Sequence, residues 1–278
     1  MSSRKSDSES GRDFVTALAR GLMVVRAFSR DKPEMTLAEV AAATRLSAAT
    51  ARRCLHTLRD LGYVSSFGRK FMLRSKILDL GAAFWSSMGL EHVAQVHLRE
   101  IVDKVGDSAS LAVLEGADVL YLAHAAHHRT VRLAAGIGVR FPAYATSLGR
   151  AMLAYLEPQL LDHYLTTVEM RPLTHRTETD SERLRQALAD VRRDGYAAIE
   201  DELDYGLASI AVPIIVGETA VAAINSSANS ARRDKAALVE ERLPILRRAA
   251  GTITRAVEQS PALLHSLSNG ASRTRQPA

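Results

Sequence analysis

The sequence contains little of what a secreted or membrane protein needs. It has one cysteine, Cys54, in 278 residues, which excludes an internal disulfide framework and fits a reducing compartment. No apolar run approaches the roughly 18 uninterrupted residues that a membrane span requires. The first residues, MSSRKSDSESGRD, lack the apolar core of a signal peptide. We therefore expect a cytoplasmic protein with no membrane partner.

What the sequence does contain is a chain that can pack, with its charge segregated. Hydrophobic residues make up 47% and charged residues 24%, which is ordinary for a globular protein of about two domains. Residues 1–75 carry 14 Lys and Arg against 7 Asp and Glu, whereas residues 76–278 carry 22 against 24. The basic excess is therefore entirely N-terminal. A module that neutralises phosphates has this pattern, and so does a solvated basic face on an enzyme.

The N-terminal region begins with two predicted helices. The apolar residues of the first helix recur at three- and four-residue spacing, which predicts one buried stripe: Phe14, Leu18, Leu22, Val25 and Phe28. A short second helix is predicted to begin after Thr36, because Thr36 and Glu39 have the spacing of a reciprocal capping box. A turn then leads to Ser47, the next candidate N-cap.

A third helix and a hairpin complete this region. The third helix has a predicted buried stripe of Ala51, Cys54, Leu55, Leu58 and Leu61. Its opposite face presents Ala49, Arg52, Arg53, His56 and Arg59, and Gly62 is placed to cap its end. The segments YVSS and FMLR flank a glycine turn and predict a hairpin with a basic tip at Arg69 and Lys70.

Two consecutive helices of this kind followed by a basic hairpin predict a winged helix-turn-helix. In that arrangement the third helix enters the major groove, and the hairpin lies along phosphates or in the minor groove. The residues predicted to read bases are Ser47, Ala48, Ala49, Thr50 and Arg53. Those predicted to contact phosphates are Arg52, His56, Arg59, Arg69 and Lys70, and Thr36 joins the DNA-contacting set. The alternative is a three-helix domain whose basic face serves protein contacts.

We divide the chain into five parts. They are a flexible tail (1–12), the winged helix-turn-helix domain (13–74), a linker helix (75–89), an effector domain (90–260) and a second flexible tail (261–278). The linker helix has a broad apolar face, which predicts either a dimer contact that sets the spacing of two DNA half-sites or packing against the effector domain.

The C-terminal region alternates short strands with helices. Predicted helices cover residues 90–105, 147–156, 158–166, 180–194 and 232–259, and predicted strands include a hairpin around Gly116, then 129–135, 207–216 and 219–227. The RFPAY segment is expected to be a loop that leads into the helix at Ser147. The pattern predicts an α/β (α+β) protein in which helices cover the faces of a mixed sheet.

Several segments resemble the IclR family of bacterial regulators, and together they span nearly the whole chain. They are RGLMVVRAF, TLAEVAAAT with the third helix, RFPAYATSLGRAMLA, GLASIAVP and VAAIN. The segments TARRCLHTLRDLGYV and RFPAYATSLGR most resemble the branch that controls aromatic-acid catabolism through protocatechuate, 4-hydroxybenzoate and β-ketoadipate. The resemblance implies a GAF-like effector domain, a homodimer or tetramer on a pseudo-palindromic operator in double-stranded DNA, and a small organic acid as effector. We keep RNA polymerase as a candidate partner.

The resemblance also places the effector against the sheet, below the loop that leads to Ser147. Pocket positions carried over from the family are Ser147, Leu148, Ser209, Asn225 and Ser227, bordered by Asp201 and Glu202. The helix N-terminus supports this place on physical grounds, because the N–H groups of residues 147–149, up to Gly149, and the Thr146 hydroxyl could receive a carboxylate. For Asn225 and Ser227 the alternative is that they only cap strand ends.

One departure concerns charge in the expected pocket. Relatives often read GLRS where this chain has Ala208 in place of the arginine, so the arginine that could neutralise an acid is absent. Arg132, Arg140 or Arg150 could substitute for it.

Catalytic and metal motifs are weak in this sequence. ATSLG lacks the first glycine of a nucleophile elbow, and Cys54 lies on the predicted buried face of a helix. His124, His127 and His128 lack accompanying Cys, Asp or Glu at ligand spacing, so we interpret them as exposed loop residues. We therefore expect an effector-controlled DNA-binding regulator with no catalytic residues, metal or cofactor. The alternative is a small-molecule enzyme or sensor with an incidental basic domain.

Overall fold

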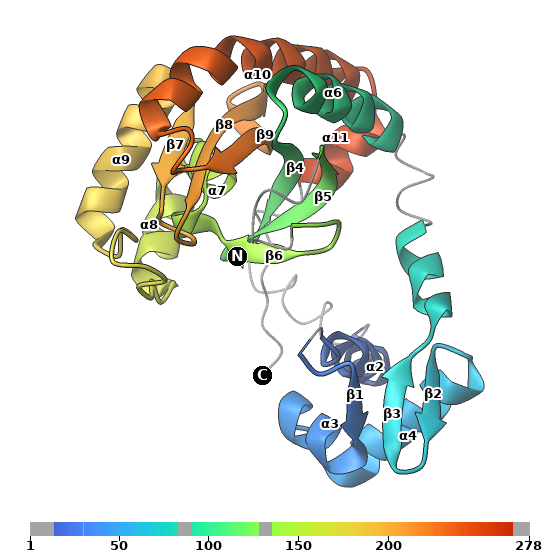
Figure 1. Cartoon of the computed structure of the whole chain (residues 1–278). Coiled ribbons are helices and arrows are strands. Elements are labelled where there is room, and N and C mark those ends of the chain that lie inside the picture. The colour runs from blue at the N-terminus through green and yellow to red at the C-terminus, as the bar shows by residue number, and fades with distance from the viewer. Residues whose placement is uncertain (1–13, 30, 83–89, 128–134, 269–278) are drawn as a thin grey trace, which may run out of the picture. The chain divides into compact units, whose positions relative to one another are not determined.

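The protein divides into two compact units, residues 1–87 and 88–278 (Figure 1). The structure is a computed structural model that describes residues 14–29, 31–82, 90–127 and 135–268. Each unit has its own hydrophobic core. Within the described ranges, no helix combines the length and the apolar character needed to cross a bilayer.

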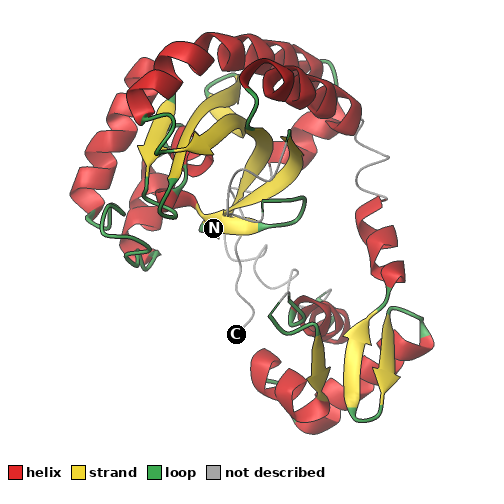
Figure 2. Ribbon diagram, in the orientation of Figure 1, coloured by secondary structure: helices red, strands yellow, loops and turns green. Residues whose placement is uncertain are grey.

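The N-terminal unit combines three helices with a small sheet (Figure 2). The helices are α2 (Thr16–Arg26), α3 (Leu37–Thr44) and α4 (Ala48–Asp60). The strands β1 (Glu34–Thr36), β2 (Val64–Phe67) and β3 (Lys70–Leu73) pair antiparallel in the order β1-β3-β2. Strand β1 was not predicted, since three residues are too few to show alternation. A short 3-10 helix, Ser75–Ile77, starts the predicted linker, whose residues 83–89 lie outside the described ranges.

The predicted start and stop signals of these helices are confirmed. Thr36 Oγ1 accepts a hydrogen bond from the Glu39 N–H, and the Thr36 N–H donates to Glu39 Oε2 at 2.7 Å, which completes the capping box. Ser47 Oγ accepts from the Thr50 N–H at the start of α4. Gly62 follows α4 with φ +84°, a backbone conformation that favours glycine.

The predicted buried stripe of the first helix is wrong over most of its length. Phe14, Leu18 and Leu22 are 59%, 63% and 49% exposed, and Val24 is the one residue that α2 buries fully. Leu61, predicted to be buried at the end of α4, is 54% exposed. The spacing indicated correctly that this face is apolar, but spacing does not say whether the face meets its own core.

The C-terminal unit is a six-stranded sheet with helices on both faces. Its first half contains α6 (Leu90–Val105), β4 (Ser108–Glu115), β5 (Asp118–Ala126), β6 (Arg140–Pro142), a 3-10 turn (Ala143–Ala145), α7 (Ser147–Leu153) and α8 (Pro158–Thr167). Its second half contains α9 (Ser181–Asp194), β7 (Ala197–Glu200), β8 (Leu207–Val216), β9 (Thr219–Asn229), α10 (Lys235–Glu258) and α11 (Pro261–Ser268).

The strand order is β6-β5-β4-β9-β8-β7, and all of these pairings are antiparallel. The fold class is α+β as predicted, but the expected mixture of strand directions is wrong. Two strands were missed: β6 was predicted as a loop, and β7 precedes the acidic stretch. Both are edge strands of three or four residues, too short for a clear alternating pattern. The predicted strand at 129–135 falls almost wholly outside the described residues.

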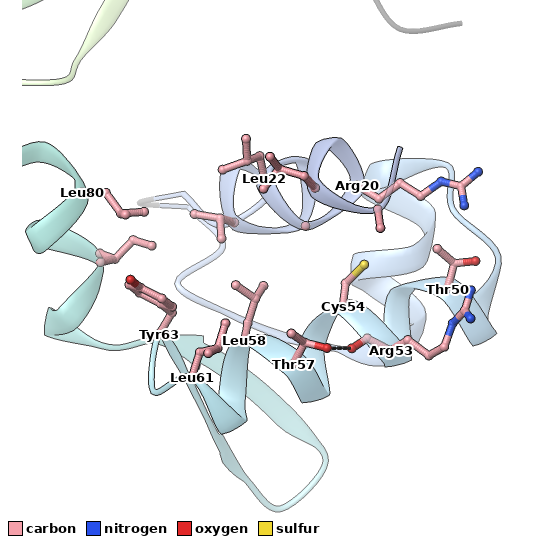
Figure 3. Close-up of a pocket in the computed structure, with 15 residues that line it drawn as sticks. Arg20, Leu22, Thr50, Arg53, Cys54, Thr57, Leu58, Leu61, Tyr63 and Leu80 are labelled. Atoms are coloured by element: carbon pink, nitrogen blue, oxygen red, sulfur yellow. Dashed lines mark hydrogen bonds between the residues drawn. The ribbon is translucent and has the colours of Figure 1, made fainter. Parts of the chain in front are cut away.

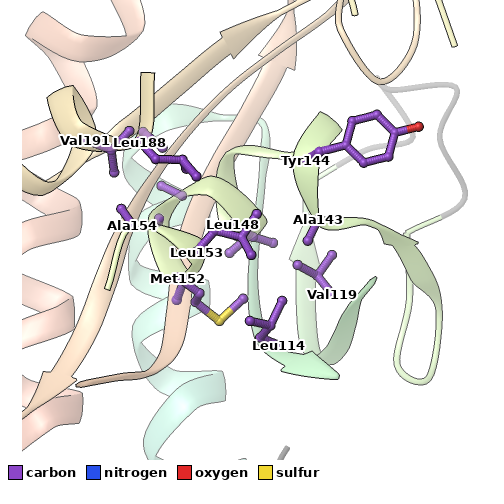
Figure 4. Packing of buried hydrophobic residues seen from close by; sticks show 14 of the residues in the cluster. Leu114, Val119, Ala143, Tyr144, Leu148, Met152, Leu153, Ala154, Leu188 and Val191 are labelled. Atoms are coloured by element: carbon purple, nitrogen blue, oxygen red, sulfur yellow. The ribbon is translucent and has the colours of Figure 1, made fainter. Parts of the chain in front are cut away.

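Helix α7 packs against one face of the sheet. Its residues Leu148, Met152 and Leu153 are at most 1% exposed and contact apolar residues of β4, β5 and α9 (Figure 4). Helix α10 covers the opposite face, where the side chain of Arg242 reaches Ser226 of β9. Because side chains alternate along a strand, Asn225 and Ser227 face the side of α7.

The predicted flexible tail from residue 261 is wrong over its first eight residues. Pro261–Ser268 form α11, which buries Leu263 and Leu267 to 3% and 5% exposure. The polar composition of the whole segment concealed these two anchoring leucines. The remaining tail residues, 1–12 and 269–278, lie outside the described ranges.

Candidate DNA-binding and ligand-binding sites

The outer face of α4 carries two arginines that are free to meet a partner. Arg52 and Arg53 are exposed, as are Ala48 and Ala49 before them, and neither arginine forms an ion pair within the residues described. At the start of the helix, the Ser47 hydroxyl donates to Thr50 Oγ1 at 2.9 Å. The structure therefore presents one end of α4 as a cationic surface.

Other predicted DNA contacts already have partners within the protein. Arg59 lies 3.4 Å from the Asp60 carboxylate and 3.3 Å from His56 Nδ1. Lys70 forms an ion pair with Glu34 on the neighbouring strand β1, which raises the pKa of Lys70 through its hydrogen bond and charge. Arg69, at the tip of the hairpin, is exposed and has no ion pair among the described residues. Arg69 thus supplies the accessible positive charge of the tip.

In the C-terminal unit, four predicted effector residues meet in one buried polar cluster. The hydroxyl oxygens of Ser147 and Ser209 are 2.7 Å apart, which links α7 to β8. The Asn225 amide donates to Ser209 Oγ at 3.1 Å and to Ser227 Oγ at 3.2 Å. The Ser227 hydroxyl donates to Ser209 Oγ at 2.9 Å. The idea that Asn225 and Ser227 only cap strand ends is wrong, because both lie inside β9 and join this cluster.

The cluster contains one unsatisfied acceptor. Asn225 is 3% exposed, and its Oδ1 has no hydrogen-bond partner among the residues that the structure describes. Both amide hydrogens of Asn225 are already directed to serines. A buried polar atom without a partner costs roughly 1 to 3 kcal/mol, so Oδ1 is suited to a hydrogen-bond donor from outside the chain.

The N-terminus of α7 differs from what was expected. Thr146 is its N-cap, and its hydroxyl accepts from the Gly149 N–H at 3.0 Å, so this N–H is not free for a carboxylate. Leu148 is fully buried in the core. Gly149 lies so close to the backbone of Ala143 that a Cβ would come within 2.1 Å of the Ala143 carbonyl oxygen. Thr146 and Gly149 therefore fix the start of α7, where Ser147 joins the cluster.

The structure does not bring the acidic residues to the cluster. Glu202 forms a bidentate ion pair with Arg150, which is 6% exposed and also donates from Nε to the Tyr144 carbonyl at 2.8 Å. Asp201 Oδ1 accepts from the Gly206 N–H at 2.9 Å and from the Ser230 hydroxyl at 2.8 Å. Both acids therefore serve the surrounding loop.

The three arginines that were expected as substitutes for the missing one differ in whether they are free to bind a ligand. Arg150 is occupied by Glu202, and Arg140 is exposed and donates to the Glu115 carbonyl at 3.3 Å. Arg132 lies outside the described residues. Among the described residues, the cluster therefore contains hydroxyl and amide groups that can bind an acid, and it contains no cation.

The sequence interpretation missed His124 and Ser110. His124 lies on strand β5, not on an exposed loop, and its Nδ1 is 3.0 Å from Ser110 Oγ. Ser110 is paired directly with Asn225 across β4 and β9, so both residues share the face of the cluster. Burial lowers the pKa of His124, which favours a neutral imidazole. A β-bulge between the pairings of Leu111 and Ala112 with β5 puts Tyr121 and His124 on the same face, and simple alternation could not show this.

The three clustered histidines are not predicted to form a metal site. His128 lies outside the described ranges, and no group of three His, Cys, Asp or Glu within them is placed to hold a metal ion.

The chain matches two described protein domains. Residues 17–66 match the IclR helix-turn-helix domain, and residues 82–255 match the C-terminal domain of the bacterial transcriptional regulator IclR. The chain is 42% identical over 236 residues to the Pca regulon regulatory protein of Pseudomonas putida, covering 84% of this chain and 81% of the relative. It is 30% identical over 247 residues to the p-hydroxybenzoate hydroxylase transcriptional activator of Acinetobacter baylyi, covering 87% and 91%.

A solved structure of a family member has a similar fold. The fold is similar to the crystal structure of an IclR homolog complexed with 4-hydroxybenzoate from Microbacterium hydrocarbonoxydans, with a TM-score of 0.76 and 28% identity. The similarity covers 88% of this chain and 100% of that one.

Proposed function

Since the chain belongs to the IclR family of bacterial transcriptional regulators and falls with its aromatic-acid regulators, we propose that it binds a pseudo-palindromic operator through α4 and the β2–β3 hairpin, under the control of a hydroxylated aromatic acid. The observation that supports a hydroxylated ligand is the buried Asn225 Oδ1, which has no hydrogen-bond partner among the described residues. The family consists of regulators and not enzymes, so the enzyme alternative falls away. We place its action in the cytoplasm, where the DNA is.

We assign the DNA-contacting roles of the basic residues according to whether each one is already ion-paired within the protein. Arg52 and Arg53 are unpaired on α4 and meet DNA without breaking an internal contact, and Arg53 is the candidate for bidentate contact with guanine. Arg59 and Lys70 must exchange a carboxylate for a phosphate, so we expect them to contribute less. The hydroxyls of Ser47 and Thr50, two of the proposed base-reading residues, are hydrogen-bonded to each other at the helix start.

We expect Arg53→Ala to weaken binding to the protein's own upstream operator by about 1 to 3 kcal/mol, with a much smaller effect on unrelated duplexes. Fluorescence anisotropy at several salt concentrations measures both affinities. Arg171→Ala is the matched control, because it removes one exposed arginine from the other unit. Equal losses on both duplexes would make Arg53 a phosphate contact, and wild-type protein that binds no upstream fragment at low salt would overturn the proposed function.

We further propose that the operator is bound by two copies of the chain that meet at the N-terminal unit. A groove of about 570 Å³ runs between α2, α4 and the start of the linker, and its lining is mainly apolar (Figure 3). Leu18, Leu22 and Leu61 lie there and are 63%, 49% and 54% exposed. A pseudo-palindrome needs two readers related by symmetry, and a second copy brings the same apolar groove. Two chains per operator in sedimentation of the complex support this, four indicate a tetramer, and one contradicts it.

The ligand half of the proposal follows from the donors and acceptors of the cluster. Asn225 Oδ1 accepts a hydrogen bond from a ligand hydroxyl, and the hydroxyls of Ser147, Ser209 and Ser227, hydrogen-bonded in the same cluster, surround that end of the ligand. The apolar residues of α7 and β4 that adjoin the cluster suit an aromatic ring. Ser110 on β4, next to β9, and His124 on β5, one strand further, are candidates for binding the carboxylate at the other end of the ligand. The relative named for p-hydroxybenzoate hydroxylase and the neighbour that holds 4-hydroxybenzoate support this class.

We expect wild-type protein to bind 4-hydroxybenzoate about 5- to 150-fold more tightly than benzoate, because benzoate leaves the Asn225 oxygen unsatisfied. Asn225→Ala should lose most of this preference while still binding benzoate. Asn229→Ala, the same change at the partly buried end of β9, where Asn229 Oδ1 accepts from the Ala231 N–H, is the control. Calorimetric titration and the ligand-induced rise in melting temperature give the affinities. An unchanged preference in Asn225→Ala would contradict the assigned role of its oxygen.

A further inference from the structure

The tip of the β2–β3 hairpin exposes an aromatic ring. Phe67 is 83% exposed, the highest value among the large hydrophobic residues described as exposed. Phe67 pairs with Lys70, so only Gly68 and Arg69 form the turn, and Gly68 has φ +58°. A two-residue turn with a positive φ at its first position is tight, so the ring projects from a short, well-defined tip.

Phe67 is not part of the core of its unit. In the three-stranded sheet, Met35, Val64, Phe71 and Leu73 contact the core. Phe67 lies opposite Lys70, and Lys70 precedes the core-contacting Phe71 on β3. Because neighbouring side chains on a strand point to opposite faces, Lys70 and Phe67 lie on the outer face of the sheet. Among the described residues, Phe67 is not one of those that pack against this core, so we expect a polar residue there to leave the fold intact.

The charges beside Phe67 favour nucleic acid as the partner of this ring. Arg69 is exposed and without an ion pair among the described residues, whereas Lys70, the next residue along, is paired with Glu34 of β1. Within this tip, residues 65–70 contain no acid. Apolar side chains that enter the minor groove can separate two stacked base pairs. Arginines favour narrow minor grooves because the negative electrostatic potential is strongest there.

We propose that Phe67 is an apolar wedge that inserts between base pairs in the minor groove beside each half-site, with Arg69 in the same groove. This inference rests on the proposed function, since it requires operator binding. The insertion unstacks one base step and bends the duplex, so flexible pyrimidine–purine steps at that position would be preferred. The hairpin then contributes to sequence preference through deformation of the DNA as well as through phosphate contacts.

The test compares Phe67→Ala, Phe67→Leu and Arg69→Ala on the footprinted operator. Phe67→Ala should bind about 5- to 150-fold more weakly, the range that loss of a base–aromatic contact produces. It should leave the salt dependence unchanged, because no charge is lost, whereas Arg69→Ala should reduce the logarithmic salt slope by about 0.9. Phe67→Leu keeps an apolar wedge and should retain most of the bend. Ile137→Ala, which removes an exposed apolar group from the other unit, is the control.

Two optical readouts follow the DNA itself. Energy transfer between dyes at the duplex ends reports the bend, and 2-aminopurine placed through the flanking steps brightens where a base is unstacked. Wild-type protein should brighten one step per half-site, and Phe67→Ala should brighten none. If Phe67→Ala bound the operator as tightly as the wild-type protein and bent it equally, the wedge would be refuted and the proposed function would remain. A loss of dimers in Phe67→Ala would assign the ring to a second copy and overturn it too. Failure of wild-type protein to bind any operator would instead refute the proposed function.

Discussion

Replacing Gly149 with alanine is expected to destabilise the C-terminal unit by about 3 kcal/mol or more, the upper part of the range for overpacked cores. An added Cβ would lie 2.1 Å from the Ala143 carbonyl oxygen and 2.4 Å from the Ala143 Cα. Both are backbone atoms, so no side chain can rotate away. Ala143 is itself held, because its N–H donates to the Ala117 carbonyl at 3.0 Å.

The consequences should reach the ligand site. Gly149 is the third residue of α7, and Ser147 of the polar cluster is the first. If α7 moves away from Ala143, the 2.7 Å contact between Ser147 and Ser209 cannot persist. We therefore expect Gly149→Ala to lose most of its affinity for 4-hydroxybenzoate as well as its stability.

Differential scanning calorimetry of the full chain measures the effect, with an expected fall in melting temperature of roughly 6 to 12 °C. Gly251→Ala is the matched control: it makes the same change inside α10, where the nearest atom to the new Cβ outside the adjoining helix backbone would be Arg255 Nη1 at 3.9 Å. That variant should be slightly stabilised, by about 0.5 to 1 kcal/mol, because alanine favours helix. A Gly149→Ala protein that melts with the control would contradict the proposed close approach.

Features of the N-terminal unit that are local in sequence could be predicted. Thr36 and Glu39 lie three residues apart and cap one helix, and Ser47 caps the next, so neither needed knowledge of distant contacts. A local sequence pattern could not show which surface an apolar helix face contacts. Leu18 and Leu22 have helical spacing, yet they line an open groove. Spacing reports which face is apolar and not which partner covers it.

For the ligand site, the resemblance located residues that physical reasoning alone would not have joined. Ser147 and Ser209 are 62 residues apart in sequence and meet because α7 crosses β8. The physical argument for a helix N-terminus at Ser147 was weaker, because Thr146 already satisfies the Gly149 N–H. His124 escaped because a bulge breaks the alternation on which a strand's faces are assigned. Arg150 was expected to be available, but its pairing with Glu202 depends on a loop fold that the sequence does not reveal.

The second large effect is expected behind the ligand site, on the opposite face of the sheet. Arg242 of α10 is 1% exposed, and its guanidinium forms an ion pair with Asp107 between α6 and β4. Its Nη1 donates to Ser226 Oγ at 2.8 Å and lies 3.4 Å from the Ser227 carbonyl. Arg242 thus holds the backbone of β9 at the residue whose side chain, on the other face, joins the ligand cluster.

We expect Arg242→Met to lower the free energy of unfolding by about 3 to 5 kcal/mol, because it leaves the Asp107 carboxylate buried without its partner. Arg242→Met combined with Asp107→Asn should recover part of this loss, since the double variant leaves no uncompensated charge. Arg233→Met, which breaks the exposed pair with Glu241 beside α10, should cost at most about 1 kcal/mol. Urea denaturation of wild type, Arg242→Met, Asp107→Asn and the double variant yields the coupling energy between Arg242 and Asp107, and Arg233→Met is measured beside them.

Ligand titration of the same variants separates stability from coupling to the site. If Arg242 fixes β9, Arg242→Met should weaken 4-hydroxybenzoate binding under conditions where it remains folded, and Arg233→Met should not. An Arg242→Met protein as stable as Arg233→Met, or a double variant no more stable than Arg242→Met, would show that the buried pair does not hold the strand. Because Asp107 follows α6, and α6 follows the predicted linker, a positive result would also identify a physical connection between the ligand cluster and the segment that leads to the DNA-binding unit.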